Sequence, residues 1–252
     1  MKLTKHKLHT FSAALALGVL SFGFTPAAMA ISTYDAAASF SLTLTDVTDV
    51  GGTTVTSGWD VAAFGSGSTF LSESGVASAT GTTSVIDPAV SLSILDTITQ
   101  SSISSGTASN GLASTDALTD LGITVSNSSG QDVTFSFDYS IVLDAFADAS
   151  APGDFADASA SVDFLDDLGA VDIQAFADAL ADNGLQLLAV GAGSVRDSGT
   201  FSFTLANGQS NLISGFVDSF GSASAVPVPA AVWLFGSGLL GLVGVARRKQ
   251  AA

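Results

Sequence analysis

Carboxylates are the main side chains of this chain that could carry out chemistry. The 252 residues hold 23 Asp and Glu against 7 Lys and Arg, with two histidines and no cysteine. Both histidines, His6 and His9, lie near the N-terminus, and Arg196 is the single basic residue between residues 31 and 225. That stretch therefore has no Cys, His or Lys for a nucleophile with its base or for a Cys/His zinc site.

Two kinds of carboxylate chemistry stay open for this stretch. A pair of carboxylates could hydrolyse glycosides, and a cluster of them could bind Ca²⁺ through oxygen. The best calcium candidates are Asp163, Asp166 and Asp167, although no EF-hand loop or Gly-rich nonapeptide repeat surrounds them. A solvated acidic face that keeps the protein soluble is the plainer interpretation. We expect no enzyme, no catalytic residue, and no cofactor beyond weak, diffuse calcium binding.

The charges are distributed very unevenly along the chain. The formal net charge is −16, and all 23 acidic residues lie between residues 31 and 225. Phosphate binding needs Lys and Arg, so this composition excludes a nucleic-acid partner. The six basic residues outside that stretch lie at the two ends of the chain: Lys2, Lys5, Lys7, Arg247, Arg248 and Lys249.

Residues 1–30 follow the pattern of a secretory signal peptide. A basic start precedes the mostly apolar residues 11–24, and Ala28 and Ala30 form a small-x-small cleavage site. We expect the general secretion machinery to export the chain and signal peptidase to cleave it after Ala30, so that Ile31 begins the mature protein. The alternative is an uncleaved membrane anchor, for which the apolar core is short.

The C-terminal residues 226–252 form a second targeting segment. Val226, Pro227, Val228 and Pro229 precede an apolar run, residues 230–246, that is just long enough for a transmembrane helix. Trp233 suits the membrane interface, and the basic end should stay in the cytoplasm. Four glycines weaken the run as a permanent anchor: Gly236, Gly238, Gly241 and Gly244. An ordinary single-span anchor is the alternative interpretation.

Residues 226–249 resemble the PEP-CTERM sorting signal of Gram-negative bacterial surface proteins. In this resemblance Val226 to Pro229 occupy the short motif, with Val228 where the family has glutamate, and Arg247, Arg248 and Lys249 form the basic end. The resemblance implies recognition by exosortase and an association with extracellular polysaccharide and biofilm. It further implies export across the inner membrane, a transient anchor in the C-terminal helix, and release to the cell surface or matrix.

Period-two alternation of apolar and polar residues predicts β-structure between residues 31 and 225. The longest such stretch, residues 132–150, is followed by turn residues 151–154 and a second alternating stretch, residues 156–164, which predicts a long hairpin. Asn207-Gly208 predicts another hairpin that returns through residues 210–225. Residues 65–68 are expected in a loop, and residues 171–188 in strand or irregular structure in competition with a short helix. We expect an all-β, antiparallel sandwich or jelly-roll-like exported domain over residues 31–225, with helices in the two targeting segments.

Three classes of function stay open for this domain. The favoured one is a non-catalytic surface or extracellular-matrix protein processed at its C-terminal signal. The alternative is a secreted sugar- or cell-binding module, with or without calcium, in which Trp59 is the candidate contact residue. The third is a carboxylate-type enzyme, which would need two carboxylates facing each other in a cleft.

Overall fold

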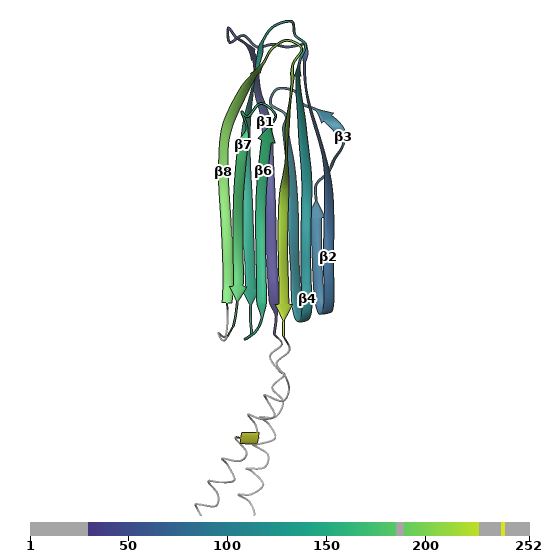
Figure 1. Cartoon of the computed structure of the whole chain (residues 1–252), viewed down its shortest axis with the longest axis vertical. Helices are drawn as coiled ribbons and strands as arrows, with labels where there is room; N and C mark the ends of the chain where they lie inside the picture. Colours follow the sequence, from purple (N-terminus) through teal and green to yellow (C-terminus); the bar gives the residue numbers. More distant parts are fainter. Residues whose placement is uncertain (1–29, 185–188, 227–237, 240–252) are drawn as a thin grey trace, which may run out of the picture.

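Nine strands, most of them long, make up the domain in the computed structural model, which describes residues 30–184, 189–226 and 238–239 (Figure 1). All pairings between them are antiparallel. The strands are β1 (Ser32–Asp49), β2 (Trp59–Thr83), β3 (Ile86–Ser91), β4 (Thr97–Asn127), β5 (Val133–Ala149), β6 (Phe155–Asp166), β7 (Asp172–Asp182), β8 (Ala189–Leu205) and β9 (Ser210–Ala225). The expectation of an all-β antiparallel domain is confirmed.

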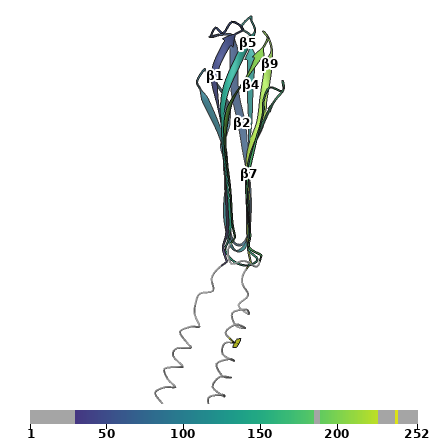
Figure 2. The ribbon, with the colours of Figure 1, turned by 90° about the vertical axis from the view of Figure 1, so that its left-hand side faces the viewer.

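One sheet folds over on itself to give two layers (Figures 1 and 2). The strand order is β7-β6-β9-β4-β1-β5-β8, with β2 paired along the length of β4. On the side away from β2, β4 has two different neighbours along its length. Its residues 97–108 pair with β1, and its residues 111–126 pair with β9. Both β2 and β4 turn back at one end of the molecule, at Gly75 and Gly111, which have positive φ and lie opposite each other. A Cβ on either glycine would overlap the backbone of the other strand, so glycine is required at both positions.

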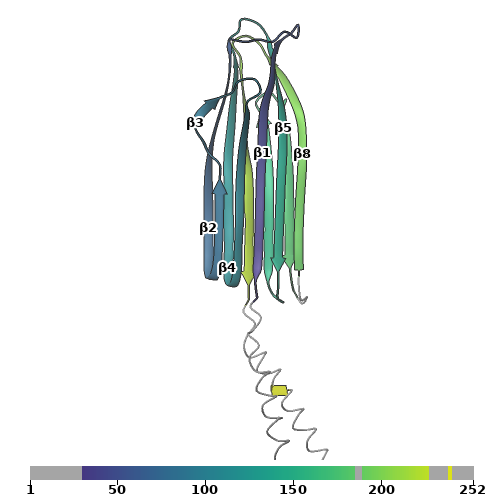
Figure 3. The ribbon, with the colours of Figure 1, turned by 180° about the vertical axis from the view of Figure 1, so that it is seen from behind.

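The first layer contains β7, β6 and β9, together with residues 111–127 of β4 and residues 59–74 of β2, which lie on the same side of the turns at Gly111 and Gly75. The second layer contains β8, β5, β1 and the other halves, residues 97–108 and 76–83. We call the end at which β1 begins and β9 ends the terminal end; both strands lie in the middle of their layers (Figure 3).

The two layers lie close together at the terminal end and spread apart toward the other end (Figure 2). Side-chain size explains this taper. Near the terminal end the buried apolar cluster consists of alanines and Tyr34, whereas the wider half is filled by Phe, Leu, Ile and Val. Stacked rings such as Phe40 on Phe164, with centroids 4.1 Å apart, fill the wide half. Alanine alone between two sheets lets their backbones approach, because the separation of packed sheets follows the size of the interdigitating side chains.

The predicted strands are confirmed, but both predicted hairpins are wrong. β5 pairs with β1 and β8, while β6 pairs with β7 and β9, so the turn at residues 151–154 crosses from one layer to the other. β9 likewise pairs with β4 and β6, although Gly208 follows β8 in a tight turn. Alternation shows that one face of each strand is buried. It does not show whether the next strand in the chain pairs beside it or crosses to the opposite layer.

Residues 65–68 lie within β2, so the expectation of a loop there is wrong. Their glycines serve close packing, since a Cβ on Gly65 would meet the Asp120 carbonyl oxygen at 2.6 Å and one on Gly67 would meet Thr83. Residues 172–182 form β7, as expected, with no helix over that range.

Residues 1–29 of the predicted signal peptide lie outside the described residues, as do residues 227–237 and 240–252 of the predicted sorting signal. The described part of that sorting signal comprises Val226, Gly238 and Leu239, and the last two have helical backbone. Within the described ranges, no helix has both the length and the hydropathy needed to cross a bilayer.

Candidate functional site at the terminal end

The terminal end brings the predicted N-terminal cleavage point close to the residue that precedes the predicted sorting signal. Ala30, the last residue of the predicted signal peptide, and Ala225, the last residue of β9, belong to the same buried alanine cluster. The hydroxyl of Ser32 donates a hydrogen bond of 2.9 Å to the Ser224 carbonyl oxygen, which joins the start of β1 to the end of β9. The chain therefore enters and leaves the domain at adjacent positions.

The predicted N-terminal cleavage point is held by the turn after β5. The Ile31 N–H donates to Ser150 Oγ at 2.8 Å, and the Ser150 N–H donates to the Ile31 carbonyl oxygen at 3.1 Å. Ala30 is buried, while Ile31 is 46% exposed. Ile31 thus keeps two contacts that do not depend on the residues before it.

The start of the predicted sorting motif is held by a buried carboxylate. Asp154 is fully buried, and its Oδ1 accepts a hydrogen bond of 3.1 Å from the Val226 N–H. Its Oδ2 accepts another, of 3.0 Å, from the Ala151 N–H. Both carboxylate oxygens are therefore used, one for the crossing turn and one for the exit of the chain. Val226 itself is 50% exposed.

Asn183, just beyond β7, completes this arrangement. It is fully buried, its amide donates to the Ala149 carbonyl oxygen at 2.8 Å, and its backbone N–H donates to the Asp154 carbonyl oxygen at 3.1 Å. Sequence reasoning missed both Asp154 and Asn183, because Pro-Gly-Asp and Asp-Asn-Gly are ordinary compositions for exposed turns. Their position at the ends of alanine-rich strands is the signal that could have pointed to them.

No protein-family model, curated protein or solved structure matches the chain. The terminal end is therefore characterised by its own contacts. It holds two extended chain segments side by side through hydrogen bonds to backbone groups, which in the described residues come from Ser32, Ser150, Asp154 and Asn183. This geometry fixes where the chain leaves the domain.

Of the residues predicted for the C-terminal signal, only Val226 and Gly238 are described. The other predicted residues lie outside the described ranges: Pro227, Val228, Pro229, Trp233, Gly236, Gly241, Gly244, Arg247, Arg248 and Lys249. Ala28, in the predicted N-terminal cleavage site, also lies outside them.

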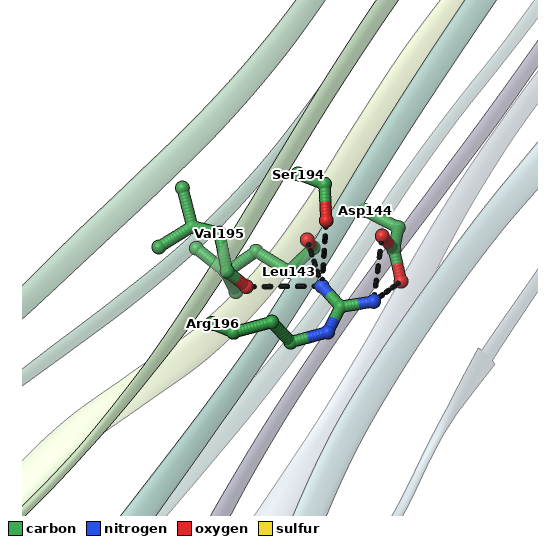
Figure 4. A network of polar contacts seen from close by, with 5 residues as sticks. All are labelled: Leu143, Asp144, Ser194, Val195 and Arg196. Atoms are coloured by element: carbon green, nitrogen blue, oxygen red, sulfur yellow. Dashed lines mark hydrogen bonds and ion pairs between the residues drawn. The ribbon is translucent and has the colours of Figure 1, made fainter.

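Arg196 uses both terminal nitrogens of its guanidinium group in polar contacts on the outer face of the second layer (Figure 4). Its guanidinium contacts both oxygens of Asp144, at 2.9 and 2.7 Å, and also donates to Ser194 Oγ at 2.8 Å. It reaches the carbonyl oxygens of Leu143 and Val195 as well, at 2.8 and 3.0 Å. The bond from Arg196 lowers the pKa of Asp144, so this carboxyl stays ionised and would not serve as a general acid.

The three calcium candidates are not gathered into a site. Asp163 lies within β6, opposite Gln174 of β7. Asp166 closes the following turn, because its Oδ1 accepts from the Val171 N–H and its Oδ2 from the Asn211 amide, both at 2.8 Å. Among the described residues, no group of three or more His, Cys, Asp or Glu is placed to hold a metal ion.

Trp59 packs at the rim of the core. Its indole N–H donates to the Val55 carbonyl oxygen at 2.7 Å, and its ring meets Phe135 edge-on with centroids 6.3 Å apart. The ring's hydrogen-bonding group is thus occupied within the domain. Sequence reasoning gave Trp59 a candidate contact role; its observed contacts are those of a core residue.

One carboxyl on the outer face of the first layer has an unusual acidity. Partial burial, together with the neighbouring Asp116 carboxylate, raises the pKa of Asp218 from 3.8 to about 6. Asp116 and Asp218 come from the paired strands β4 and β9. They form a like-charged pair in which one proton is held more tightly than usual.

Proposed function

We propose that the chain is an exported, non-catalytic protein of the cell surface or extracellular matrix, associated with biofilm and exopolysaccharide, whose C-terminal signal is recognised and processed by exosortase. The hydrogen bond from the Val226 N–H to the buried Asp154 supports this proposal most directly. It ties the folded domain to the residue immediately before Pro227 of the motif.

A processing enzyme needs an extended segment that is free of the folded domain. Pro227 and Pro229 favour extended backbone in the residues that precede them. Because β9 ends at Ala225 and Asp154 holds Val226, cleavage after that point would leave the domain's hydrogen bonds intact. The same reasoning applies to Ile31, whose bonds to Ser150 do not depend on the signal peptide.

The location and finer architecture belong to the same proposal. Residues 1–30 direct export across the inner membrane of a Gram-negative bacterium, a helix over residues 230–246 anchors the chain transiently, and the jelly-roll-like sandwich is then released to the surface or matrix. General secretion machinery, signal peptidase, exosortase and extracellular polysaccharide are the proposed partners.

Cell fractionation followed by intact-mass measurement of the surface form tests this sequence of events. We expect a protein that begins at Ile31 and has lost the residues through Lys249. A surface form that still carries the complete tail would contradict the sorting proposal. A surface form that still begins at Met1 would contradict only the cleavage after Ala30.

Replacing the motif prolines tests recognition separately from folding. Pro227→Ala combined with Pro229→Ala should leave uncleaved precursor in the inner membrane. Pro152→Ala is the matched control, because Pro152 is an exposed proline of the crossing turn outside the motif. Equal processing of both variants would show that the processing enzyme does not recognise the motif prolines.

A shallow groove on the first layer supports a second candidate function, sugar binding. The groove, of about 270 Å³, lies between Phe176 and Phe216 and is also lined by Asp163 and Gln174. Aromatic faces beside carboxylate and amide groups are a combination that can contact sugar rings and hydroxyls. Phe176 is 60% exposed, so its ring is accessible.

Affinity electrophoresis in gels containing soluble polysaccharide tests this candidate. Phe176→Ala should abolish any retardation, whereas Phe146→Ala, an exposed phenylalanine of the second layer, should not. Repeating the measurement with millimolar calcium, together with thermal unfolding, tests the calcium-dependent form. An unchanged midpoint of unfolding and unchanged mobility would rule that form out.

A further inference from the structure

Strand β2 forms an open margin of both layers. Strand β3 pairs only with residues 62–65 of β2, and beyond them no described strand pairs with the outer side of β2. After the fold at Gly75, residues 76–83 form the margin of the second layer. One strand therefore presents two stacked, unpaired edges along the same side of the molecule.

The apolar interior reaches this margin without being closed. Leu71 is paired with Thr115, which is fully buried between the layers, so Leu71 faces the interior as well. It is nevertheless 54% exposed, because no described strand lies beyond it. Phe70 and Val76, on the outer faces beside it, are 68% and 59% exposed. An unpaired edge with exposed apolar residues is a template for pairing with another strand.

Charge distinguishes this margin from the opposite one. Between residues 61 and 83 the only charged side chain is Glu73, and there is no proline. The opposite margin, made by β7 and β8, carries Asp172, Asp178, Asp182, Asp197 and Arg196. In a chain of net charge −16, a second copy meets the least electrostatic repulsion at β2.

The direction of the two edges makes them complementary to each other. Residues 66–74 run toward the terminal end and residues 76–83 run away from it (Figure 3). A twofold axis parallel to the strands would therefore place residues 66–74 of one copy antiparallel to residues 76–83 of the other, in both layers at once. We propose that the β2 margin binds a second copy of this chain and so forms the interface of a symmetric dimer. Both copies then keep their terminal ends on the same side.

The internal packing of β2 sets the register. A Cβ on Gly67 would meet Thr83, and one on Gly81 would lie 3.2 Å from Thr69, so residues equally far from Gly75 lie at the same height. When the Gly75 turns of the two copies lie at the same height, Leu71 lies opposite Ala79 of the partner subunit, and Phe70 lies opposite Thr80 of the partner subunit.

Glu73 occupies one hydrogen-bonding position of this margin. Its Oε1 accepts a hydrogen bond of 2.6 Å from the Ala79 N–H, which shows that this amide is not used by the ladder with β4. In the dimer a backbone carbonyl of the second copy takes over that role and the carboxylate turns to solvent.

Sedimentation of the full-length chain in detergent tests the proposal. We expect a dimer, and Leu71→Asp should raise its dissociation constant by roughly tenfold or more, because it introduces like charges where the copies meet. Leu180→Asp is the control, since Leu180 of β7 is 59% exposed at the opposite margin. Far-UV circular dichroism confirms that both variants are folded. A chain that stays monomeric, or a dimer weakened by Leu180→Asp alone, would overturn the proposal.

Cross-linking gives a second test that does not depend on weakening the dimer. The chain has no cysteine, so Phe70→Cys and Thr80→Cys each introduce a single thiol. Within one copy these residues lie on different outer faces, but across the proposed interface they are directly opposed, at a separation that a disulfide can span. Oxidising a mixture of the two variants should give a covalent dimer, and oxidising Phe70→Cys mixed with Leu180→Cys should give none. Equal yields from both mixtures, or none from either, would contradict the interface.

Discussion

The ring of Tyr34 fills the space in which a side chain on Gly221 would have to lie. Tyr34 comes from β1 in the second layer and Gly221 from β9 in the first, so the two residues face each other between the layers. Tyr34 is 2% exposed, and its hydroxyl bonds to Thr115 Oγ1 at 2.7 Å. A Cβ on Gly106, the strand partner of Tyr34, would also overlap the ring. One large side chain is thus accommodated in the thin half of the domain by two glycines.

Gly221→Ala should therefore destabilise the domain. The added methyl group overlaps the ring of Tyr34, and overpacking of this kind costs about 1–3 kcal/mol. Urea denaturation of the wild type, Gly221→Ala, Tyr34→Ala and the double variant measures the coupling. The double variant should lose less stability than the two single variants together; strict additivity would mean that the two side chains do not compete.

Enlarging an alanine in the thin half should also be costly. Ala147 is fully buried in β5 near the terminal end. In Ala147→Leu the extra volume must push the layers apart, which we expect to lower the free energy of unfolding by about 1–3 kcal/mol or more. Val142→Leu is the control on the same strand, since Val142 is 37% exposed on the outer face. Thermal unfolding that shows equal losses for both variants would contradict the taper as a consequence of side-chain size.

Replacing Asp154 should weaken the terminal end. Asp154→Ala leaves the Val226 and Ala151 N–H groups without their acceptor, and because both hydrogen bonds are only partly buried we expect a cost of roughly 1 kcal/mol for each. Asp154→Asn keeps one acceptor oxygen and should lie between Ala and the wild type. Hydrogen exchange at Val226 and Ala151 should accelerate in the same order. Asp132→Ala, at an exposed turn residue, is the control. If it accelerated exchange at Val226 and Ala151 as much as Asp154→Ala does, the assigned contacts would be wrong.

Stability should depend on pH through Asp218. Its pKa is about 6 in the folded chain against an ordinary value of 3.8, so the folded state holds this proton more tightly than the unfolded state. The contribution of Asp218 to the free energy of unfolding therefore falls as pH rises from about 4 to about 6, and stays low above that. Asp218→Asn should remove this fall and stabilise the domain near pH 7 by roughly 1 kcal/mol, once solvent screening is allowed for.

Urea denaturation at pH 4.5 and pH 7.5 checks this dependence. Asp138→Asn, at an exposed carboxylate of β5, is the matched control and should leave the pH dependence unchanged. A wild type and an Asp218→Asn variant with the same difference between the two pH values would contradict the assignment.

Strand positions could be predicted from the sequence, but their partners could not. The alternation over residues 132–150 corresponds closely to β5, and residues 210–225 are β9. Alternation specifies which face of a strand is buried and leaves open whether its neighbour in the chain lies beside it or in the opposite layer. The short connection at residues 151–154 can cross between layers because alanine keeps them close there, a property of several strands together. The sequence of one segment alone therefore does not show that the two layers lie close together.

The site was predicted only as far as the chain termini. The sequence predicts a domain over residues 31–225, and in the structure Ala30, just before that range, and Ala225, its last residue, belong to one alanine cluster. The burial of Asp154 could not be predicted from the sequence, because an aspartate after Pro-Gly is common in exposed turns. The folded strand β2 was also missed, since its Gly, Ser and Thr residues resemble a loop until they are seen in register with β4.

The position of β9 determines how the domain would respond to mechanical load. β9 is paired on both sides, with β4 and β6, over nearly its full length, and it leads directly into the C-terminal segment. A pull on that segment along the strands would load both ladders in shear, so that many hydrogen bonds resist together. A sideways pull would instead peel them one at a time from the terminal end. The domain is therefore expected to resist force best when the C-terminal segment is pulled parallel to the strands.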